Sequence, residues 1–402
     1  MSPARTIVLA ALRQVRGGRI DLVEPGGHST FGPPEAELRV TVEVHDPAAW
    51  RRLLRGSSGL AEGYVEGEWD CDDLVSLVRI AARELPRLDR PRRAIQPLRR
   101  LLERVPRNSV RGSRRHIAAH YDLGNELFAA FLDETMTYSC ASFESPQMPL
   151  REAQVAKLEG VCRKLELDPS DHLLEIGTGW GSLAIHAAAN HGCRVTTTTI
   201  SREQRALAQR RIAEAGLEDQ VTVLLEDYRD LRGRFDKLAS IEMIEAVGWQ
   251  YFDAYFGRCR ELIEPDGLAL LQAITIDDRD YELEKKTRSF VNSYVFPSGC
   301  LPSLAVMRRC ARRAGLAEIG LEDMTASYPP TLSCWRRNFL AARERVAELG
   351  YDKRFRRLWE LYLCWSEGGF RERRIGNYQI LLAAPQRLAV GKDRELSFAA
   401  RG

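Results

Sequence analysis

Short apolar runs recur along the second part of the chain and alternate with longer segments whose apolar residues follow helical spacing, as in Arg202–Ala215. Runs typical of buried strands that alternate with helices predict a parallel sheet covered by helices on both faces. We therefore expect a doubly wound α/β sheet from about His116 onward. The expected strands are Leu173–Ile176, Val195–Thr199, Val221–Leu224, Leu238–Ile241, Leu268–Ile276 and Ile380–Ala383.

The first 85 residues follow a different pattern. Residues Leu38–Val44 alternate between apolar and polar side chains, as in a strand with one buried face, and glycines punctuate the segment Gly59–Trp69. This pattern predicts a small α/β accessory domain over residues 1–85. The larger α/β domain is expected to span residues 116–402.

Residues 86–115 are expected to form a basic linker between the two domains. From Arg83 to Arg115 the sequence contains twelve arginines and three acidic residues, so this segment carries a net charge of +9. Such a run can be a solvated linker, but leucines recur beside the arginines, and a basic amphipathic segment suits anionic lipid headgroups. RNA is the rival partner, yet no aromatic residues interleave the arginines, so no nucleic acid is expected. We expect the linker and the N-terminal domain to contact the cytoplasmic face of a membrane.

Composition limits the remaining possibilities. A chain of 402 residues is long enough for two domains, and its 59 basic and 56 acidic residues leave a formal charge of only +3. The nine cysteines are scattered without a CxxC pair, which favours a reduced, cytoplasmic protein. No metal site is expected. The apolar run Thr6–Leu12 is short and lacks a cleavage site, so neither a signal peptide nor a transmembrane helix is expected.

The segment Leu173–Gly181 carries the most informative chemistry of the chain. It combines an apolar run, Glu175 and three alternating glycines, Gly177, Gly179 and Gly181. Glycines at these positions let the backbone approach a ligand closely, and the helix that follows would point its N-terminus at that ligand. The pattern indicates a cofactor that contains a nucleotide, although a glycine-rich turn in another α/β fold stays open.

The next strand distinguishes between cofactors. An enzyme that binds a dinucleotide carries an acidic residue for the ribose about 20 residues beyond the glycines. Residues Val195–Ser201 contain no acid, and the glycine spacing is GxGxG rather than GxGxxG. Glu175 is placed before the glycines, where it could accept hydrogen bonds from the ammonium group of an amino acid. These features favour S-adenosylmethionine over NAD.

Further motifs precede and follow the glycine turn. They are Ala119–Phe128, Phe131–Asp133, Thr137–Ala141, Thr197–Gln204 and Ile241–Gly248. With these motifs the chain resembles the cyclopropane fatty acid synthase family, which includes the mycolic acid methyltransferases, over about residues 55–385. The resemblance implies a class I methyltransferase fold, a Rossmann-like doubly wound sheet, for the larger domain.

The resemblance also implies a reaction and a cofactor site. Family members transfer the methyl group of S-adenosylmethionine to the double bond of an unsaturated acyl chain in a phospholipid. Thr199 and Gln204 agree with this cofactor, since they are neutral hydrogen-bond partners just after the second expected strand. For Tyr228 a packed loop aromatic is an equally open interpretation. The implied cofactor-binding residues are Tyr138, Ser139, Glu175, Gly177, Gly179, Gly181, Thr199, Gln204 and Tyr228.

An alkene that attacks the sulfonium methyl group becomes a carbocation, which aromatic faces can stabilise. Loss of a proton from the transferred methyl group then closes a cyclopropane ring, and the resemblance implies a bound bicarbonate ion as the base. The implied holders of this ion are Cys140, Glu245, the backbone of Ile274 and Tyr328, with Gln272 at a position that is usually histidine. The candidate aromatic residues, most of them expected in the core, are Phe290, Tyr294, Phe296, Trp335, Tyr362 and Trp365.

Gln272 leaves the product open. Glutamine can donate a hydrogen bond to an anion but cannot become a cation or share the proton that the base takes. The chain also resembles the branch of the family that makes 10-methylene fatty acids on the route to tuberculostearic acid. A cyclopropane product is the favoured expectation, and the methylene product is the alternative. A methyltransferase of a soluble molecule and a lipid-binding protein without activity are the other classes, while a homodimer and a reductase partner stay open.

Overall fold

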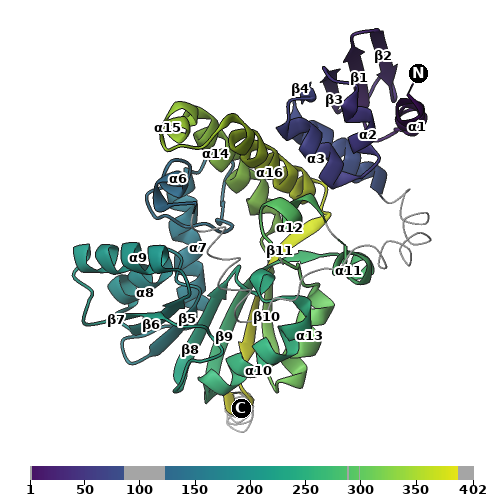
Figure 1. Ribbon diagram of the computed structural model, residues 1–402. Coiled ribbons are helices and arrows are strands. Elements are labelled where there is room, and N and C mark those ends of the chain that lie inside the picture. The colour runs from purple at the N-terminus through teal and green to yellow at the C-terminus, as the bar shows by residue number, and fades with distance from the viewer. Residues whose placement is uncertain (1, 86–122, 288, 298, 388–402) are drawn as a thin grey trace. The chain divides into compact units, whose positions relative to one another are not determined.

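The computed structural model describes residues 2–85, 123–287, 289–297 and 299–387 (Figure 1). These residues form two compact units. The first, called the N-terminal unit, consists of the described parts of Met1–Val105, Lys286–Pro297 and Tyr328–Ile375. The second, called the large-sheet unit, consists of the described parts of Pro106–Lys285, Ser298–Ser327 and Gly376–Gly402.

The large-sheet unit is built on seven strands, counted over its described residues, in the order β10-β11-β9-β8-β5-β6-β7. Strands β5 to β9 pair in parallel, and β10 pairs antiparallel with β11. All six strands expected from the apolar runs are present, so the predicted doubly wound α/β sheet is confirmed. The strands are β5 (His172–Ile176), β6 (Arg194–Thr199), β7 (Val221–Leu225), β8 (Phe235–Ile241), β9 (Ile263–Ile276), β10 (Ala317–Asp323) and β11 (Ile375–Ala383).

Helices cover both faces of this sheet (Figure 1). On one face α7, α8 and α9 pack around a core that includes Leu173, and on the other face α10 and α13 pack around a core that includes Leu174. Adjacent residues of a strand point to opposite faces, which is why one apolar run supplies both cores. The helices of this unit are α6 (Asn125–Ala129), α7 (Leu150–Lys164), α8 (Ser182–His191), α9 (Arg202–Glu214), α10 (Phe252–Leu262), α11 (Asp278–Glu284) and α13 (Leu304–Arg313).

The N-terminal unit contains a four-stranded sheet, counted over its described residues, in the order β2-β1-β3-β4. The predicted alternating strand is β3, whose Val40 packs into a small core with Val15, Ile20 and Ile80. The elements are β1 (Arg19–Glu24), β2 (Gly27–Phe31), β3 (Arg39–Val44), β4 (Trp69–Cys71), α1 (Pro3–Leu12), α2 (Ala48–Leu53), α3 (Ser57–Val65), α12 (Phe290–Tyr294), α14 (Tyr328–Ala341), α15 (Arg343–Glu348) and α16 (Lys353–Arg371).

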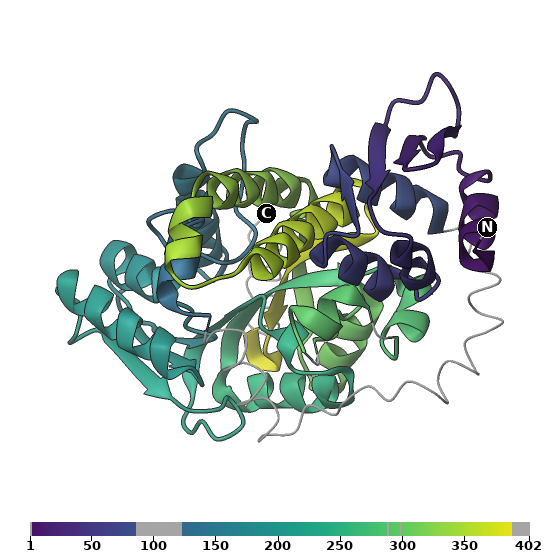
Figure 2. The same cartoon turned by 45° about the horizontal axis from the view of Figure 1, so that its top comes forward.

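Contacts between distant segments hold the N-terminal unit together. The guanidinium of Arg357 on α16 lies 3.9 Å from the centre of the Tyr64 ring, donates to the Tyr64 carbonyl oxygen at 2.6 Å and pairs with Asp70 at 2.7 Å. Glu372 pairs with Arg83 at 2.8 Å. Helices α14 and α16 run side by side in this unit (Figures 1 and 2). Arg83 therefore serves an ion pair inside this unit, although the sequence places it at the start of the basic run.

The two units differ from the predicted domains. The boundaries 1–85 and 116–402 are contiguous along the chain, whereas residues 286–297 and 328–375 group with the N-terminal residues. The physical reason is that α12 and α16 pack against α3. The predicted linker, 86–115, lies outside the described residues. Over the described part of the chain, no helix has both the length and the apolar character that crossing a membrane requires.

Candidate active site

The glycine turn connects β5 to α8 in the large-sheet unit. Gly177, Gly179 and Gly181 have φ values of +104°, +51° and +87°, which residues with a side chain rarely adopt. The N–H groups of Gly177 and Thr178 both donate to the carbonyl oxygen of Thr198 on β6 at 3.0 Å. These bonds hold the turn against the end of the neighbouring strand, where parallel sheets of this kind bind their ligands.

A pocket lies beside the turn, at the carboxyl ends of β5 and β6. Eight of the nine predicted cofactor residues line it, whereas Gly181 is outside the lining and caps the start of α8. The lining also includes Lys157, which belongs to no motif, and Glu242, which lies in the motif Ile241–Gly248 but was assigned no role. The eight predicted residues are Tyr138, Ser139, Glu175, Gly177, Gly179, Thr199, Gln204 and Tyr228.

Two buried ionisable side chains line this pocket. Glu175 on β5 accepts a hydrogen bond from the Thr197 hydroxyl at 2.6 Å, and burial raises the pKa of its carboxyl group to about 8. Lys157 on α7 donates to the Ser139 hydroxyl at 2.9 Å, and burial lowers the pKa of its ammonium group to about 8 against the opposing charge of Glu242. A ligand that carries both an ammonium and a carboxylate group would favour the charged form of each of these two side chains.

The sequence motifs did not predict Lys157 as a pocket residue, because it belongs to no motif. Its position on a helix face could have indicated it. Lys157 follows Gln154 by three residues and precedes Val161 by four, and all three lie on the buried face of α7. A lysine on the buried face of a helix requires a polar partner, and here that partner is the pocket wall.

Neutral groups at the end of β6 and the start of α9 form another part of the wall. The Thr199 hydroxyl donates to Gln204 Oε1 at 2.8 Å, and the Ser201 hydroxyl caps α9 by accepting from the Gln204 N–H at 3.2 Å. These bonds fix the orientation of the Gln204 amide. Tyr228 packs edge-on against Tyr255, with ring centroids 5.2 Å apart, so this aromatic residue is packed and also lines the pocket.

A second group of polar side chains, centred on the half-buried Glu242, lies just beyond β8. Glu242 has a φ of +51°, and its Oε1 atom accepts three hydrogen bonds. The donors are the Cys140 N–H at 3.0 Å, the Gln272 amide at 2.8 Å and the Asn377 amide at 2.7 Å. Three donors on one oxygen are typical of an ionised carboxylate. Because Glu242 also lines the pocket, this carboxylate borders the proposed cofactor site.

Glu245 lies in a short 3₁₀ helix, Ile244–Ala246, close to Glu242. Its Oε1 atom accepts from the Ile274 N–H at 2.5 Å. Its Oε2 atom is buried and has no hydrogen-bond partner among the described residues. Burial, together with the charge of Glu242, raises the pKa of the Glu245 carboxyl group to about 8. At neutral pH Glu245 is therefore mainly protonated and able to donate a hydrogen bond.

Three of the four predicted catalytic residues meet around Glu242. Gln272 is buried, donates to Glu242 and accepts from the Gln379 amide at 2.8 Å. Cys140 is buried and offers its N–H to the same carboxylate. Glu245 completes the group through the charge interaction described above. The Ile274 N–H, which the resemblance assigns to the anion, donates to Glu245 in this structure.

The fourth predicted catalytic residue, Tyr328, begins α14 in the N-terminal unit. Its ring stacks on Phe370 with centroids 4.1 Å apart. Its assignment to the anion site stays a prediction. All six candidate aromatic residues belong to the same unit, where they form edge-on pairs such as Phe290 with Trp365 at 5.8 Å.

Residues 108–380 match the family model described as mycolic acid cyclopropane synthetase. The chain belongs to this family. It is 39% identical over 351 residues to the tuberculostearic acid methyltransferase UfaA1 of Mycobacterium tuberculosis, covering 84% of this chain and 81% of the relative. It is 36% identical over 370 residues to the cyclopropane-fatty-acyl-phospholipid synthase of Escherichia coli, covering 90% of this chain and 92% of the relative.

Solved structures agree with the family assignment. The mycolic acid cyclopropane synthase CmaA1, solved with SAH and CTAB, superposes with a TM-score of 0.63 and 30% identity over 67% of this chain and 98% of that chain. Coclaurine N-methyltransferase, at 18% identity and a TM-score of 0.64, shares the fold. The predicted family, class I methyltransferase fold and S-adenosylmethionine-dependent enzyme class are thus confirmed.

Proposed function

We propose that this enzyme transfers the methyl group of S-adenosylmethionine to the double bond of an unsaturated acyl chain in a phospholipid and closes a cyclopropane ring. The observation that carries the proposal is the polar group around Glu242, a carboxylate that lines the cofactor pocket, with the buried Oε2 atom of Glu245 close to it. The synthase of Escherichia coli, named for this product, supports it as a relative aligned over most of both chains.

The pocket suits the charges of the cofactor. We assign Lys157 and Ser139 to the carboxylate of its methionine part, and Glu175 to the ammonium group. Each pairing would keep in its charged form a side chain that burial alone drives toward the neutral form. We assign the neutral groups of Thr199 and Gln204 to the nucleoside, because a hydroxyl and an amide suit its uncharged polar atoms.

Methyl transfer to an alkene needs alignment rather than a strong base. The alkene is a weak nucleophile, so the new carbon–carbon bond forms as the carbon–sulfur bond breaks and S-adenosylhomocysteine leaves. The positive charge then passes to the acyl chain. A proton must leave the transferred methyl group, and the electron pair of that C–H bond closes the ring.

We propose that a bicarbonate ion binds beside Glu245. When bound, bicarbonate supplies the base that accepts the proton of the methyl group. The residues fit an anion, since the buried Oε2 atom of Glu245 has no hydrogen-bond partner in the described part of the chain. Glu245 is also mainly protonated at neutral pH, so it can donate to an oxyanion. Cys140 and Tyr328 remain proposed partners of this ion.

Gln272 supports a second candidate, in which the same methyl transfer gives a 10-methylene chain. Its amide has no ionisable proton, and its hydrogen bonds with Glu242 and Gln379 fix its orientation. If Gln272 binds the base more weakly than a histidine would, the proton is removed more slowly. The carbocation then has time for a hydride shift before the proton is lost. UfaA1, a relative named as a tuberculostearic acid methyltransferase, makes this outcome a specific alternative.

We also propose that the protein works on the cytoplasmic face of a membrane, with residues 1–85 as its lipid-binding part and the basic linker as an anionic-lipid contact. The linker lies outside the described residues, so this step rests on the arginine-rich sequence. A homodimer and a reductase partner are further proposals that follow from the resemblance alone.

Product analysis tests the proposal. The purified enzyme is incubated with S-adenosylmethionine and vesicles of oleoyl phospholipid, and the fatty acid methyl esters are identified by mass spectrometry against cyclopropane and 10-methylene standards. A ring product is expected. A methylene product would replace ring closure with the second candidate, and the absence of any product, with activity on a soluble acceptor instead, would overturn the phospholipid assignment.

A further inference from the structure

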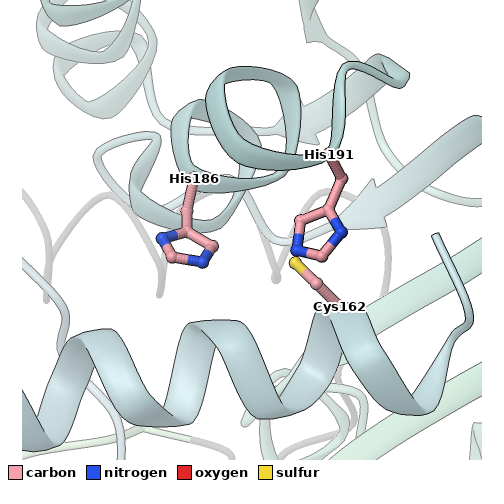
Figure 3. A group of neighbouring side chains, drawn as sticks. All are labelled: Cys162, His186 and His191. Atoms are coloured by element: carbon pink, nitrogen blue, oxygen red, sulfur yellow. The ribbon is translucent and has the colours of Figure 1, made fainter. Parts of the chain in front are cut away.

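Helices α7 and α8 bring together four side chains with metal-binding chemistry in the large-sheet unit. Cys162 rises from α7 toward the ring of His191, and His186 hangs beside them from α8 (Figure 3). Glu159 lies one turn before Cys162 on α7, so the two share a helix face. None of these residues belongs to the cofactor pocket or to the polar group around Glu242.

The donor atoms of these side chains converge. One ligand atom each from Cys162, His186 and His191 lies within 4.8 Å of the others. Glu159 Oε2 lies 3.1 Å from Nε2 of His186 and 3.1 Å from Nε2 of His191. In a tetrahedral zinc site, bond lengths of about 2.0–2.3 Å place ligand atoms about 3.3–3.8 Å apart. Small side-chain rotations would therefore bring the observed positions to that spacing.

We propose that Glu159, Cys162, His186 and His191 bind one zinc ion. One thiolate, two imidazole nitrogens and one carboxylate oxygen form a ligand set that zinc accepts and that magnesium or calcium does not favour. Four protein ligands leave no position for a substrate, so the ion is structural. This site lies outside the established chemistry of the enzyme and does not depend on the proposed function.

The surroundings suit such an ion. Cys162 is buried, and the side chains of His186 and His191 are only 12% and 16% exposed, which shields the site from solvent.

The site would link two walls of the cofactor pocket. Helix α7 contributes Lys157 and Leu158 to that pocket, and α8 contributes Ser182 and Leu183. An ion held between the helices would fix their spacing without touching the cofactor. The motifs did not reveal it, because the H-x4-H spacing, which zinc fingers also use, is not accompanied by a C-x2-C pair; Glu159 and Cys162 follow an E-x2-C spacing instead.

The full-length protein is dialysed against a chelator and titrated with ZnCl₂ in a calorimeter, and then with CoCl₂ while the absorption spectrum is recorded. The wild type is expected to bind one ion and to show thiolate-to-cobalt absorption. Cys162→Ser should abolish that absorption, and His186→Gln, His191→Gln and Glu159→Gln should each weaken zinc binding at least about tenfold. Cys310→Ser, which removes a buried cysteine on α13, serves as the matched control and should behave as wild type.

Two results would overturn the proposal. The first is the absence of saturable zinc binding to the wild type, which would leave Glu159 as a hydrogen-bond acceptor for two histidines. The second is zinc binding that the four variants do not change, which would locate the ion elsewhere. If Cys162→Ser fails to fold, the wild-type cobalt spectrum and the zinc affinity of Glu159→Gln still test the proposal. Glu159 is the most exposed of the four ligands, so its replacement disturbs the core least.

Discussion

Replacement of Glu245 by glutamine isolates the role of its carboxyl proton. Glutamine has nearly the same size and keeps an oxygen to accept the Ile274 N–H, which Glu245 Oε1 accepts at 2.5 Å. Its nitrogen can still donate to an anion, as the protonated carboxyl group can. What glutamine cannot do is exchange a proton with a base bound beside it. We therefore expect Glu245→Gln to slow turnover while leaving the affinity for S-adenosylhomocysteine unchanged.

The size of the effect follows from what is lost. A positioned group that transfers a proton contributes about 10²- to 10⁴-fold to a rate. Glu245→Gln retains the hydrogen bonds and loses only the proton exchange, so we expect the lower end, a decrease in kcat of about 100-fold, or about 2.7 kcal/mol of transition-state stabilisation. The pKa of Glu245 near 8 adds a second signature. Wild-type turnover should fall as the pH rises through about 8, because the carboxyl group then loses its proton, and the variant should lack this decline.

The assay measures methyl transfer to oleoyl phospholipid vesicles across pH and the binding of S-adenosylhomocysteine by calorimetry. Glu214→Gln, an exposed position at the end of α9, is the control for the charge change and should match the wild type. Equal losses of turnover and of S-adenosylhomocysteine affinity would refute the assignment of Glu245 to the site of the base rather than to the cofactor. An alkaline decline that persists in the variant would refute the proposed role of its carboxyl proton.

Three further predictions address the groups around this site and the N-terminal unit. Lys157→Met should weaken S-adenosylhomocysteine binding about 10- to 100-fold in calorimetry, because a charge-assisted hydrogen bond is lost, and an unchanged affinity would contradict its assignment. Glu242→Gln should move the alkaline decline of turnover to lower pH, because the charge that raises the pKa of Glu245 is removed, and an unmoved pH profile would count against this coupling. Arg357→Met should lower the unfolding free energy by about 2 kcal/mol in denaturant titrations, because the hydrogen bond of its guanidinium to the Tyr64 carbonyl oxygen is largely buried. Arg354→Met, which removes an exposed ion pair, should cost less than about 1 kcal/mol, and equal losses would contradict the argument.

The strands of the large sheet were predictable because most of them are buried on both faces. A run such as Leu173–Ile176 supplies two cores at once, so it reads as continuously apolar. Strand β10 was not predicted, since it lies at the sheet edge and most of its residues are exposed or half-exposed. Its sequence therefore lacks the apolar run by which the other strands were recognised.

The site was predictable where a local motif carries the chemistry. The glycine turn and the Thr199–Gln204 segment can be recognised in the sequence, because each is built from residues close together along the chain. The roles of Glu242 and Lys157 cannot be recognised in this way. Glu242 gains its importance from Asn377 and Cys140, which lie more than a hundred residues away in the sequence. The N-terminal unit is built from segments far apart in the sequence for the same reason, because Arg357 meets Asp70 only after folding.

The central claim is methyl transfer to a phospholipid double bond followed by loss of a proton from the transferred group. The most direct test supplies S-adenosylmethionine with a trideuterated methyl group, together with oleoyl phospholipid vesicles, and determines the deuterium content of the modified acyl chain by mass spectrometry. The account predicts a chain that retains two of the three deuterons, in a ring carbon. A chain that retains all three, or an acyl chain that remains unlabelled, would contradict it.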